Sequence, residues 1–294
     1  MAANSFNILI STQNLSDPGV VSTPTFSGGS WYAGAPLTNL QNRYLANVAR
    51  STDCTPASTQ FTCDLMGTRA VQVVVIPKHN LSTASTVTIN LYDRNNTLVS
   101  TNTVTPFPVI YPWGTLPWGD PHWLTGTITY EEWLEQEYPT PVLLILPASV
   151  LARYVQVLIS DPYNPVGYVQ LSRLFVCAGW QPSLNFTYSS SIQVIDGTVA
   201  TKTIGGAINY DQRPTFRRFN INLDLVGKNE AFVNLLDTEI RQGITGQVFV
   251  CLDPTDVVNI SRNSGIFTRS TLNPLPFAAP NYMSKSLVFD EVIA

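Results

Sequence analysis

The side chains that could do chemistry are few in this chain of 294 residues. It has two histidines, His79 and His122, and neither has a second histidine at the spacing of a metal site. Metalloprotease, serine-hydrolase and phosphate-loop motifs are missing from the sequence. We therefore expect no metal, no cofactor and no catalytic residue. His79 follows a predicted strand and is expected to hydrogen-bond a loop.

One acidic segment, residues 130–137, could supply the paired carboxylates that cleave glycosidic bonds. The segment is predicted to form a short helix, and its carboxylates are Glu131, Glu132, Glu135 and Glu137. A row of charges on a short exposed helix is more typical of a solvated face. A glycan-degrading enzyme is therefore the least favoured of the three functions that we consider; the other two are given at the end of this section.

Aromatic side chains beside Asn, Asp and His suit sugars, because a ring face packs on C–H groups while polar neighbours bind hydroxyls. Two sets fit this description. One lies in a stretch rich in proline and aromatics: Trp113, Trp118, His122 and Trp123. The other combines predicted loop tips: Trp31, Tyr32, His79, Asn80, Tyr163 and Asn164. The tryptophans could instead fill a seam between domains or subunits, and both interpretations stay open.

The four cysteines do not follow a zinc-site spacing. Cys54 and Cys63 flank a short loop and could pair, whereas Cys177 and Cys251 lie in apolar runs where a free thiol behaves as a small hydrophobe. We favour free thiols over a disulfide.

Composition narrows the class of protein. Hydrophobic residues make up 44% of the chain and charged residues 12%, roughly half the usual share of charge. Low charge fits a subunit covered by neighbours, or an ordinary secreted β-protein. The net charge of −4 argues against nucleic-acid binding, and no apolar run is long enough to span a membrane. The first residues lack the pattern of a signal peptide, so we expect assembly in the cytosol.

Strand patterns dominate the first part of the chain. Residues 71–76 form a continuous apolar run, which indicates a strand buried on both faces, and residues 86–92 alternate at period 2. Residues 64–69 are predicted to form a turn. Further strands are expected at 141–146, 153–159 and 168–177, and residues 105–140 are expected to be an insertion. We place a domain boundary near residue 182, which gives an all-β domain 1–182 and a second domain 183–294.

The second domain is predicted to be β-rich with one helix. Residues 219–225 alternate as a strand with one wet face, and strands are expected at 247–252 and 282–292. Asn229 could cap a helix over 229–242 that ends at Gly243. One face of that helix is expected to be buried: Ala231, Phe232, Leu235, Leu236 and Ile240.

Residues 61–81, 153–161 and 167–175 resemble a discoidin, or galactose-binding-type, jelly roll. The resemblance rests on an aspartate-leucine-glycine turn that here contains Met66, on the Arg153-Tyr154-Val155 strand and on a closing strand behind a loop. It covers residues 30–178 and implies a sandwich that binds ligands through its end loops.

Residues 213–219, the helix 230–241 and residues 250–254 are similar in order to the tail-tube fold of tailed bacteriophages. Together the two halves resemble a phage minor tail protein of the distal-tail or tail-tip ring type. The predicted fold is thus mainly β, with an amino-terminal jelly-roll sandwich and a carboxy-terminal sandwich or split barrel carrying one α-helix.

The first hypothesis that follows is a structural virion protein without enzymatic activity. The resemblance implies a ring of identical copies in the tail tip or baseplate, assembled in the host cytoplasm, with the tail tube and hub as partners and a host surface glycan as a further contact. The alternative is a free-standing carbohydrate-binding protein of the lectin type.

Overall fold

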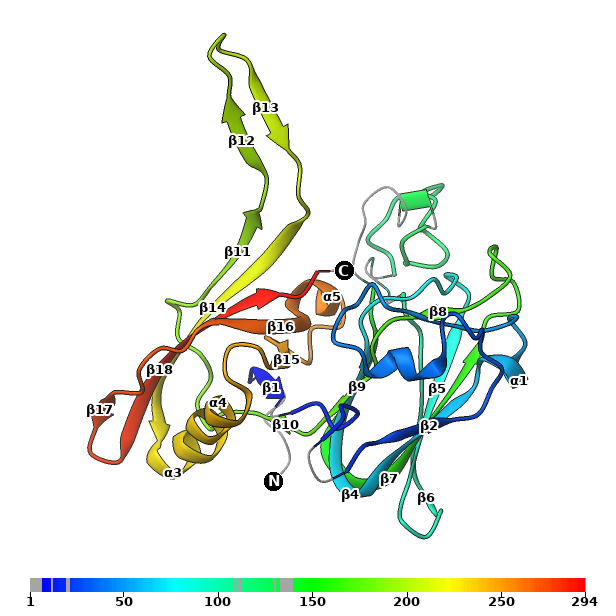
Figure 1. Cartoon of the computed structure of the whole chain (residues 1–294), viewed down its shortest axis with the longest axis horizontal. Helices are drawn as coiled ribbons and strands as arrows, with labels where there is room; N and C mark the ends of the chain where they lie inside the picture. The colour runs from blue at the N-terminus through cyan, green and yellow to red at the C-terminus, as the bar shows by residue number, and fades with distance from the viewer. Residues whose placement is uncertain are drawn as a thin grey trace.

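The computed structural model describes residues 7–11, 13–19, 22–107, 109, 111, 113–129, 131–132 and 140–293. In this part of the chain, two large antiparallel sheets account for most of the regular structure. Figure 1 shows one sheet on each side of the body, with the first part of the chain forming the right-hand side. The prediction of a mainly β protein is confirmed.

The first large sheet has the strand order β2-β4-β7-β5-β6, and β9 also pairs with β4. Strand β7 returns to lie between β4 and β5, so the order of the strands in the sheet is not their order in the sequence. The strands of this sheet are β2 (Thr25–Ser27), β4 (Phe61–Ile76), β5 (Thr86–Tyr92), β6 (Leu98–Val104), β7 (Val142–Ser160) and β9 (Phe175–Cys177).

A smaller sheet lies over the first one. It pairs β3 (Ala49–Arg50) with β8 (Gln170–Leu171), and the short helix η1 (Leu37–Gln41) contacts β3. A second short helix, α1 (Pro56–Thr59), contacts β7 of the large sheet. Leucine, valine and isoleucine side chains of both sheets share one core, which includes Leu171 of β8 and Val74 of β4. The predicted amino-terminal β-sandwich is therefore present.

Three details of this sandwich differ from the sequence-based expectation. The segment 64–69 is an irregularity inside β4, where the register shifts and Met66 has a φ of 56°, and not a turn before the strand. The strands expected at 141–146 and 153–159 are one long strand, β7. The closing strand expected at 168–177 is split into β8 and β9, because Arg173 between them turns into a buried ion pair.

The second large sheet has the strand order β10-β1-β15-β16-β18-β14-β11, with β17 also paired to β18. Its strands are β1 (Leu9–Ser11), β10 (Gly179–Trp180), β11 (Ser191–Asp196), β14 (Thr215–Gly227), β15 (Gln247–Cys251), β16 (Ser264–Thr271), β17 (Phe277–Ala279) and β18 (Tyr282–Glu291). Strands β1 and β10 come from the first 182 residues, so that part of the chain contributes to both large sheets. A domain boundary at residue 182 stays a prediction.

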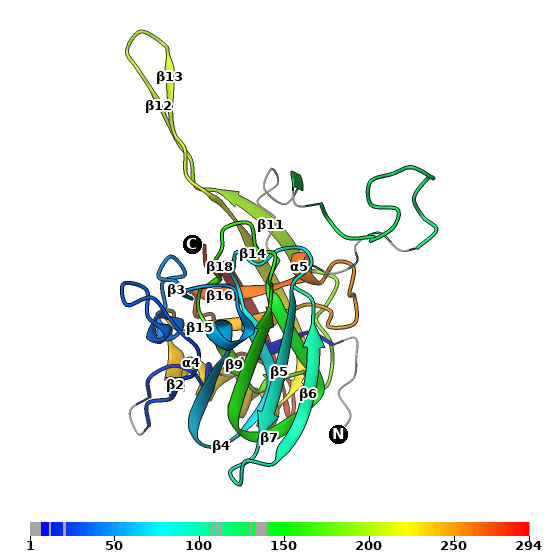
Figure 2. The same cartoon turned by 90° about the vertical axis from the view of Figure 1, so that its right-hand side faces the viewer.

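A two-stranded arm extends from this sheet. Strands β11 and β14 continue into the hairpin β12 (Val199–Lys202) and β13 (Ile208–Asp211), and Figures 1 and 2 show it projecting well beyond the body. Gly206, at the tip, has a φ of 86°, which glycine adopts without strain. The Gly205-Gly206 pair thus forms the bend at the tip of the arm.

The predicted helix is present, but the side chains that it buries differ from those predicted. It consists of α3 (Lys228–Ala231), a π-helical turn η2 (Phe232–Leu236) and α4 (Asp237–Gln242), and it ends at Gly243 with a φ of 57°. A short helix, α5 (Ile260–Asn263), precedes β16. Gly227 and not Asn229 occupies the N-cap position, and it makes no side-chain cap.

The π turn changes which side chains of this helix are buried. A π turn holds one residue more than an α turn, so residues after it are rotated from their α-helical positions. Leu236 and Ile240, expected in the core, are exposed, whereas Thr238 and Glu239 are buried. Glu239 there accepts a hydrogen bond of 2.8 Å from Lys285, which is also buried. Ala231 and Leu235 lie in the core as expected.

The two large sheets share a core of their own. Val73 and Val75 of β4 pack with Phe249 and Cys251 of β15, and the same cluster includes Leu9, Phe175, Cys177 and Ile266. Side chains of β4 that point the other way, such as Val74, enter the sandwich core. Both faces of this stretch of β4 are therefore buried, as the apolar run predicts.

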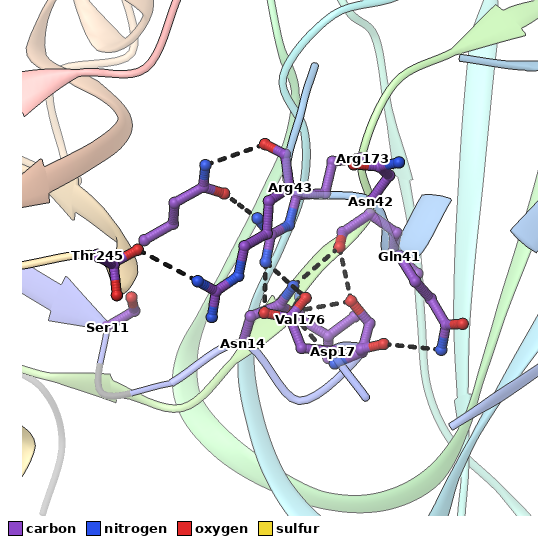
Figure 3. Close-up of polar contacts among 12 residues, drawn as sticks. Ser11, Asn14, Asp17, Gln41, Asn42, Arg43, Arg173, Val176 and Thr245 are labelled. Carbon is purple, nitrogen blue, oxygen red and sulfur yellow. Dashed lines mark hydrogen bonds and ion pairs between the residues drawn. The ribbon is translucent and has the colours of Figure 1, made fainter. Parts of the chain in front are cut away.

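A polar seam borders this shared core (Figure 3). Arg173 is fully buried and binds both carboxylate oxygens of Asp17 and the side chain of Gln247 on β15. Gln247 donates in turn to the backbone oxygen of Arg43 at 3.0 Å. Burial lowers the pKa of Arg173, and the Asp17 carboxylate opposes that shift. The seam thus joins the sandwich to the second sheet through charge and hydrogen bonds.

We predict that Asp17→Asn lowers the free energy of unfolding by about 3 kcal/mol, because it leaves a buried guanidinium without its counter-charge. Chemical denaturation followed by circular dichroism measures the change. Asp211→Asn is the matched control, since it breaks an exposed pair with Arg213 and should cost less than about 1 kcal/mol. Equal losses in the two variants would contradict the assignment.

Candidate functional site

The predicted loop-tip residues gather at one end of the sandwich. The backbone N–H of Tyr32 donates to the carbonyl oxygen of Arg50 at 2.8 Å, and Ser51 donates to Val169 at 2.9 Å. The side chain of Asn80 donates to the carbonyl oxygen of Tyr168 at 2.9 Å. Segments distant in sequence are thereby held side by side.

This end carries a group that we name the sandwich-end surface: Tyr32 and Tyr163, which are exposed, and Arg50 and Tyr168, which are half-buried. The guanidinium of Arg50 lies 3.6 Å from the ring centroid of Tyr168 and 5.6 Å from that of Tyr32. Such stacking fixes the arginine over an aromatic face. Sequence reasoning missed Arg50 and Tyr168, because they meet only when β3 pairs with β8, which no local pattern indicates.

The other residues of this predicted set work inside the protein. Asn164 is buried and donates to the backbone oxygen of Asn80 at 2.9 Å and to Asp161 at 2.8 Å. The indole N–H of Trp31 donates to the carbonyl oxygen of Gly28 at 3.0 Å, and its ring packs edge-on against Phe61. Trp31, Asn80 and Asn164 therefore shape the loops, and Tyr32 and Tyr163 remain as exposed members of the set.

His79 is buried below the insertion rather than exposed at a loop tip. Its Nδ1 accepts from the backbone N–H of Leu81 at 3.2 Å, and its ring packs edge-on against Phe107, where the insertion begins. Burial lowers the pKa of His79 to about 4, so the imidazole is neutral at neutral pH. The expected loop-bonding role of His79 is confirmed, and its place in a ligand-binding surface is wrong.

The insertion carries a cluster that we name the tryptophan patch: Trp113, Trp118 and Trp123. The ring centroid of Trp123 lies 5.6 Å from that of Trp113 and 4.6 Å from that of Trp118. Trp113 is 80% exposed and Trp118 is 85% exposed, so broad aromatic faces meet solvent. Figure 2 shows this segment projecting from the sandwich. Two of its other side chains, Phe107 and Ile128, are buried.

Charged groups fix the turn next to this patch. The two ring nitrogens of His122 lie 2.7 Å from a carboxylate oxygen of Asp120 and 2.6 Å from one of Glu132. The hydrogen bond to Glu132 is the main reason that the pKa of His122 is raised. A raised pKa means that this contact stabilises the fold fully below about pH 6.5 and weakens as pH rises through the folded-state pKa. Tyr111 packs on the same imidazole, with ring centroids 4.8 Å apart.

The acidic segment is described only at Glu131 and Glu132; Trp133, Glu135 and Glu137 lie outside the described residues. The Glu132 carboxylate accepts from the backbone N–H of Thr129 at 3.0 Å as well as contacting His122. Both interactions lower the pKa of Glu132, that from Thr129 more strongly. This carboxylate thus holds the insertion, whereas a general acid requires a raised pKa.

All four cysteines are free thiols, as favoured from the sequence. Burial raises the pKa of Cys63 and of Cys251 to about 12, so neither forms a reactive thiolate at neutral pH. Over the described ranges, no three His, Cys, Asp or Glu side chains converge as a metal site would need. No helix in those ranges is long and apolar enough to cross a bilayer.

We predict that His79 makes the fold acid-sensitive between pH 6.5 and pH 4. The unfolded chain binds a proton on this imidazole below about pH 6.5, whereas the folded chain resists until about pH 4, so acid favours unfolding. Between pH 7 and pH 5 the loss is on the order of 2 kcal/mol, and His79→Gln should lack this component. Urea denaturation at both pH values measures it. The prediction fails if His79→Gln keeps the wild-type difference. His122→Gln, the control, should keep the loss and enlarge it, because the His122 contact becomes more stabilising as pH falls.

The sequence matches no described protein family and no curated protein. Among solved structures, the chain is similar to a family 32 carbohydrate-binding module (CBM32-1) of a family 31 glycoside hydrolase from Clostridium perfringens, with 9% identity and a TM-score of 0.37. That match covers 55% of this chain and 97% of the module. A fucose-binding module of Streptococcus pneumoniae, SpX-3, matches with 12% identity and a TM-score of 0.36, covering 56% of this chain and 98% of that one.

The family 32 carbohydrate-binding module of NanJ from Clostridium perfringens, solved with galactose, matches with 14% identity and a TM-score of 0.35. The match covers 52% of this chain and 92% of that one. Likenesses at such TM-scores and identities do not indicate a shared ligand, so a function for this chain depends on its own surfaces.

Proposed function

We propose that this protein binds glycans without transforming them, and that the tryptophan patch is the binding surface. The observation that carries this proposal is the exposure of Trp113 and Trp118, both packed against Trp123. Exposed apolar surface of this kind usually marks an interaction site. A platform of indole rings is suited to the C–H face of a pyranose ring.

Polar groups beside the platform could orient a sugar. Asp120 and Glu132 are carboxylates that accept hydrogen bonds from hydroxyls, and both are positioned by His122. The sandwich-end surface is a second place with exposed rings, Tyr32 and Tyr163, and the guanidinium of Arg50 lies beside Tyr32. It lacks a cluster of stacked indoles, so the tryptophan patch is our first choice.

We predict that the chain binds oligosaccharides weakly, with Kd values between about 1 mM and 1 μM. Trp118→Ala should weaken binding about tenfold, because it removes one exposed stacking face. A glycan array finds the ligand and isothermal titration calorimetry measures the affinity.

Tyr44→Ala is the matched control, an exposed aromatic outside both surfaces. A loss with Tyr32→Ala but not with Trp118→Ala would move the site to the sandwich end; an array without hits would sink the proposal.

A second candidate function is that of a structural subunit in the virion tail of a phage, assembled in the host cytoplasm next to tail-tube and hub proteins. The observation that favours it is a row of exposed apolar side chains along the helix, Val233, Leu236 and Ile240, with Ile244 exposed just after the helix ends. The three helical residues are three or four positions apart, so they lie towards one side of the helix. Tail assembly would cover such a row, as in other obligate assemblies.

We predict for this second function that the purified chain forms closed rings of more than two copies at high concentration. Ile240→Lys should abolish them while leaving the circular dichroism spectrum unchanged, because Ile240 is 74% exposed and contributes little to the monomer. Negative-stain imaging and mass photometry measure the outcome. Rings that survive Ile240→Lys would assign assembly to another surface, and the absence of rings for the wild type would remove this candidate.

A further inference from the structure

Strand β11 is an open edge of the second sheet. Its six residues pair with β14 in unbroken register, and across the described residues no strand pairs with its other side. Edge strands are usually protected by lysine, proline, a bulge or a short length. Strand β11 reads Ser-Ile-Gln-Val-Ile-Asp and carries none of these devices, since its one charge, Asp196, stands at its outer end. Its free backbone N–H and C=O groups are therefore available for pairing.

One face of this edge continues the hydrophobic core. Ile192 lies opposite Phe219, which is fully buried in the core beneath the second sheet. Ile192 and Val194 share that face because they are two residues apart, yet they are 51% and 66% exposed. The core thus ends at two uncovered aliphatic side chains, where an added strand would extend it.

We propose that a second copy of this chain occupies the edge, with its own β11 paired antiparallel to the first. In such a two-fold contact, residues of the same face must lie opposite each other. The register that pairs the longest part of β11 while leaving Asp196 outside places Gln193 on the two-fold axis. Ile192 of each copy then lies opposite Val194 of the other, on the face that continues the core.

The edge is complementary to itself. This register places no charged residue opposite a charged one, and it joins apolar side chains on the core face. Antiparallel pairing also directs the arm of each copy back along the segment that precedes β11 in the other, where Leu184 and Tyr188 are exposed. All residues of β12 and β13 are exposed in the single chain, and a lone two-stranded ribbon is marginally stable in water. A second copy would give the arm a surface to lie against.

Cross-linking tests the register directly. Gln193→Cys should form a disulfide-linked dimer under mild oxidation, because residues directly opposite across a strand pair have Cβ atoms roughly 5 Å apart. Thr201→Cys, on the exposed β12 and off the axis, is the matched control, and the wild type reports any linkage through the four native cysteines. Non-reducing gel electrophoresis measures the product. The proposal is overturned if Gln193→Cys links no more than Thr201→Cys.

A second variant tests the association without cysteine chemistry. Val194→Lys should raise the dimer dissociation constant at least tenfold, since it places a charge in the paired face, while thermal unfolding of the monomer stays unchanged at this exposed position. Ile240→Lys, at an exposed position away from β11 and from the arm, should leave the dimer intact. Sedimentation velocity over a concentration series measures this. A wild type that stays monomeric throughout, or a Val194→Lys variant that dimerises normally, contradicts the proposal. Monovalent glycan binding should survive Val194→Lys, so a failure here leaves the proposed function untouched.

Discussion

The packing of β4 against β15 is the contact on which the rest of the structure depends. Val73 and Val75 on one strand meet Phe249 and Cys251 on the other, and both strands carry a separate core on their opposite faces. The molecule is thus layered, from small sheet to large sheet to second large sheet to helix. Because burial of apolar surface is the main stabilising term in folding, the middle core fixes the sandwich relative to the second sheet.

The buried ion pair between Arg173 and Asp17 fixes how the layers are positioned relative to one another. Apolar side chains alone would tolerate some sliding of one sheet over the other, since dispersion and burial are not directional. The contacts of Arg173 prevent such sliding, because its guanidinium binds Asp17 and Gln247 at the same time. The loops at the sandwich end and the arm on the far sheet therefore keep a fixed relation.

Local patterns predicted most strands, since period and burial are encoded residue by residue. The run at 71–76 lies in a strand with the expected burial. The alternation expected over 219–225 holds as far as Leu223 and breaks at a bulge, where Leu225 is exposed. Features set by tertiary contacts were not accessible: the π turn rotates Ile240 outward, and the irregularity in β4 replaces a turn with continued strand. For the candidate site, the sequence singled out the tryptophans but left open whether they are exposed or fill a seam. The burial of His79 and the stacking of Arg50 on Tyr168 depend on partners distant in sequence.

The π turn in the helix has a consequence for how this surface can change. One additional residue in the turn decides that Glu239 faces Lys285 and that Ile240 faces water. Loss of a single residue there would rotate the carboxylate outward and the isoleucine inward with every other amino acid intact. The rotation of the helix therefore decides whether its exposed side is apolar or charged. An insertion or deletion in the π turn could change that side more than a substitution.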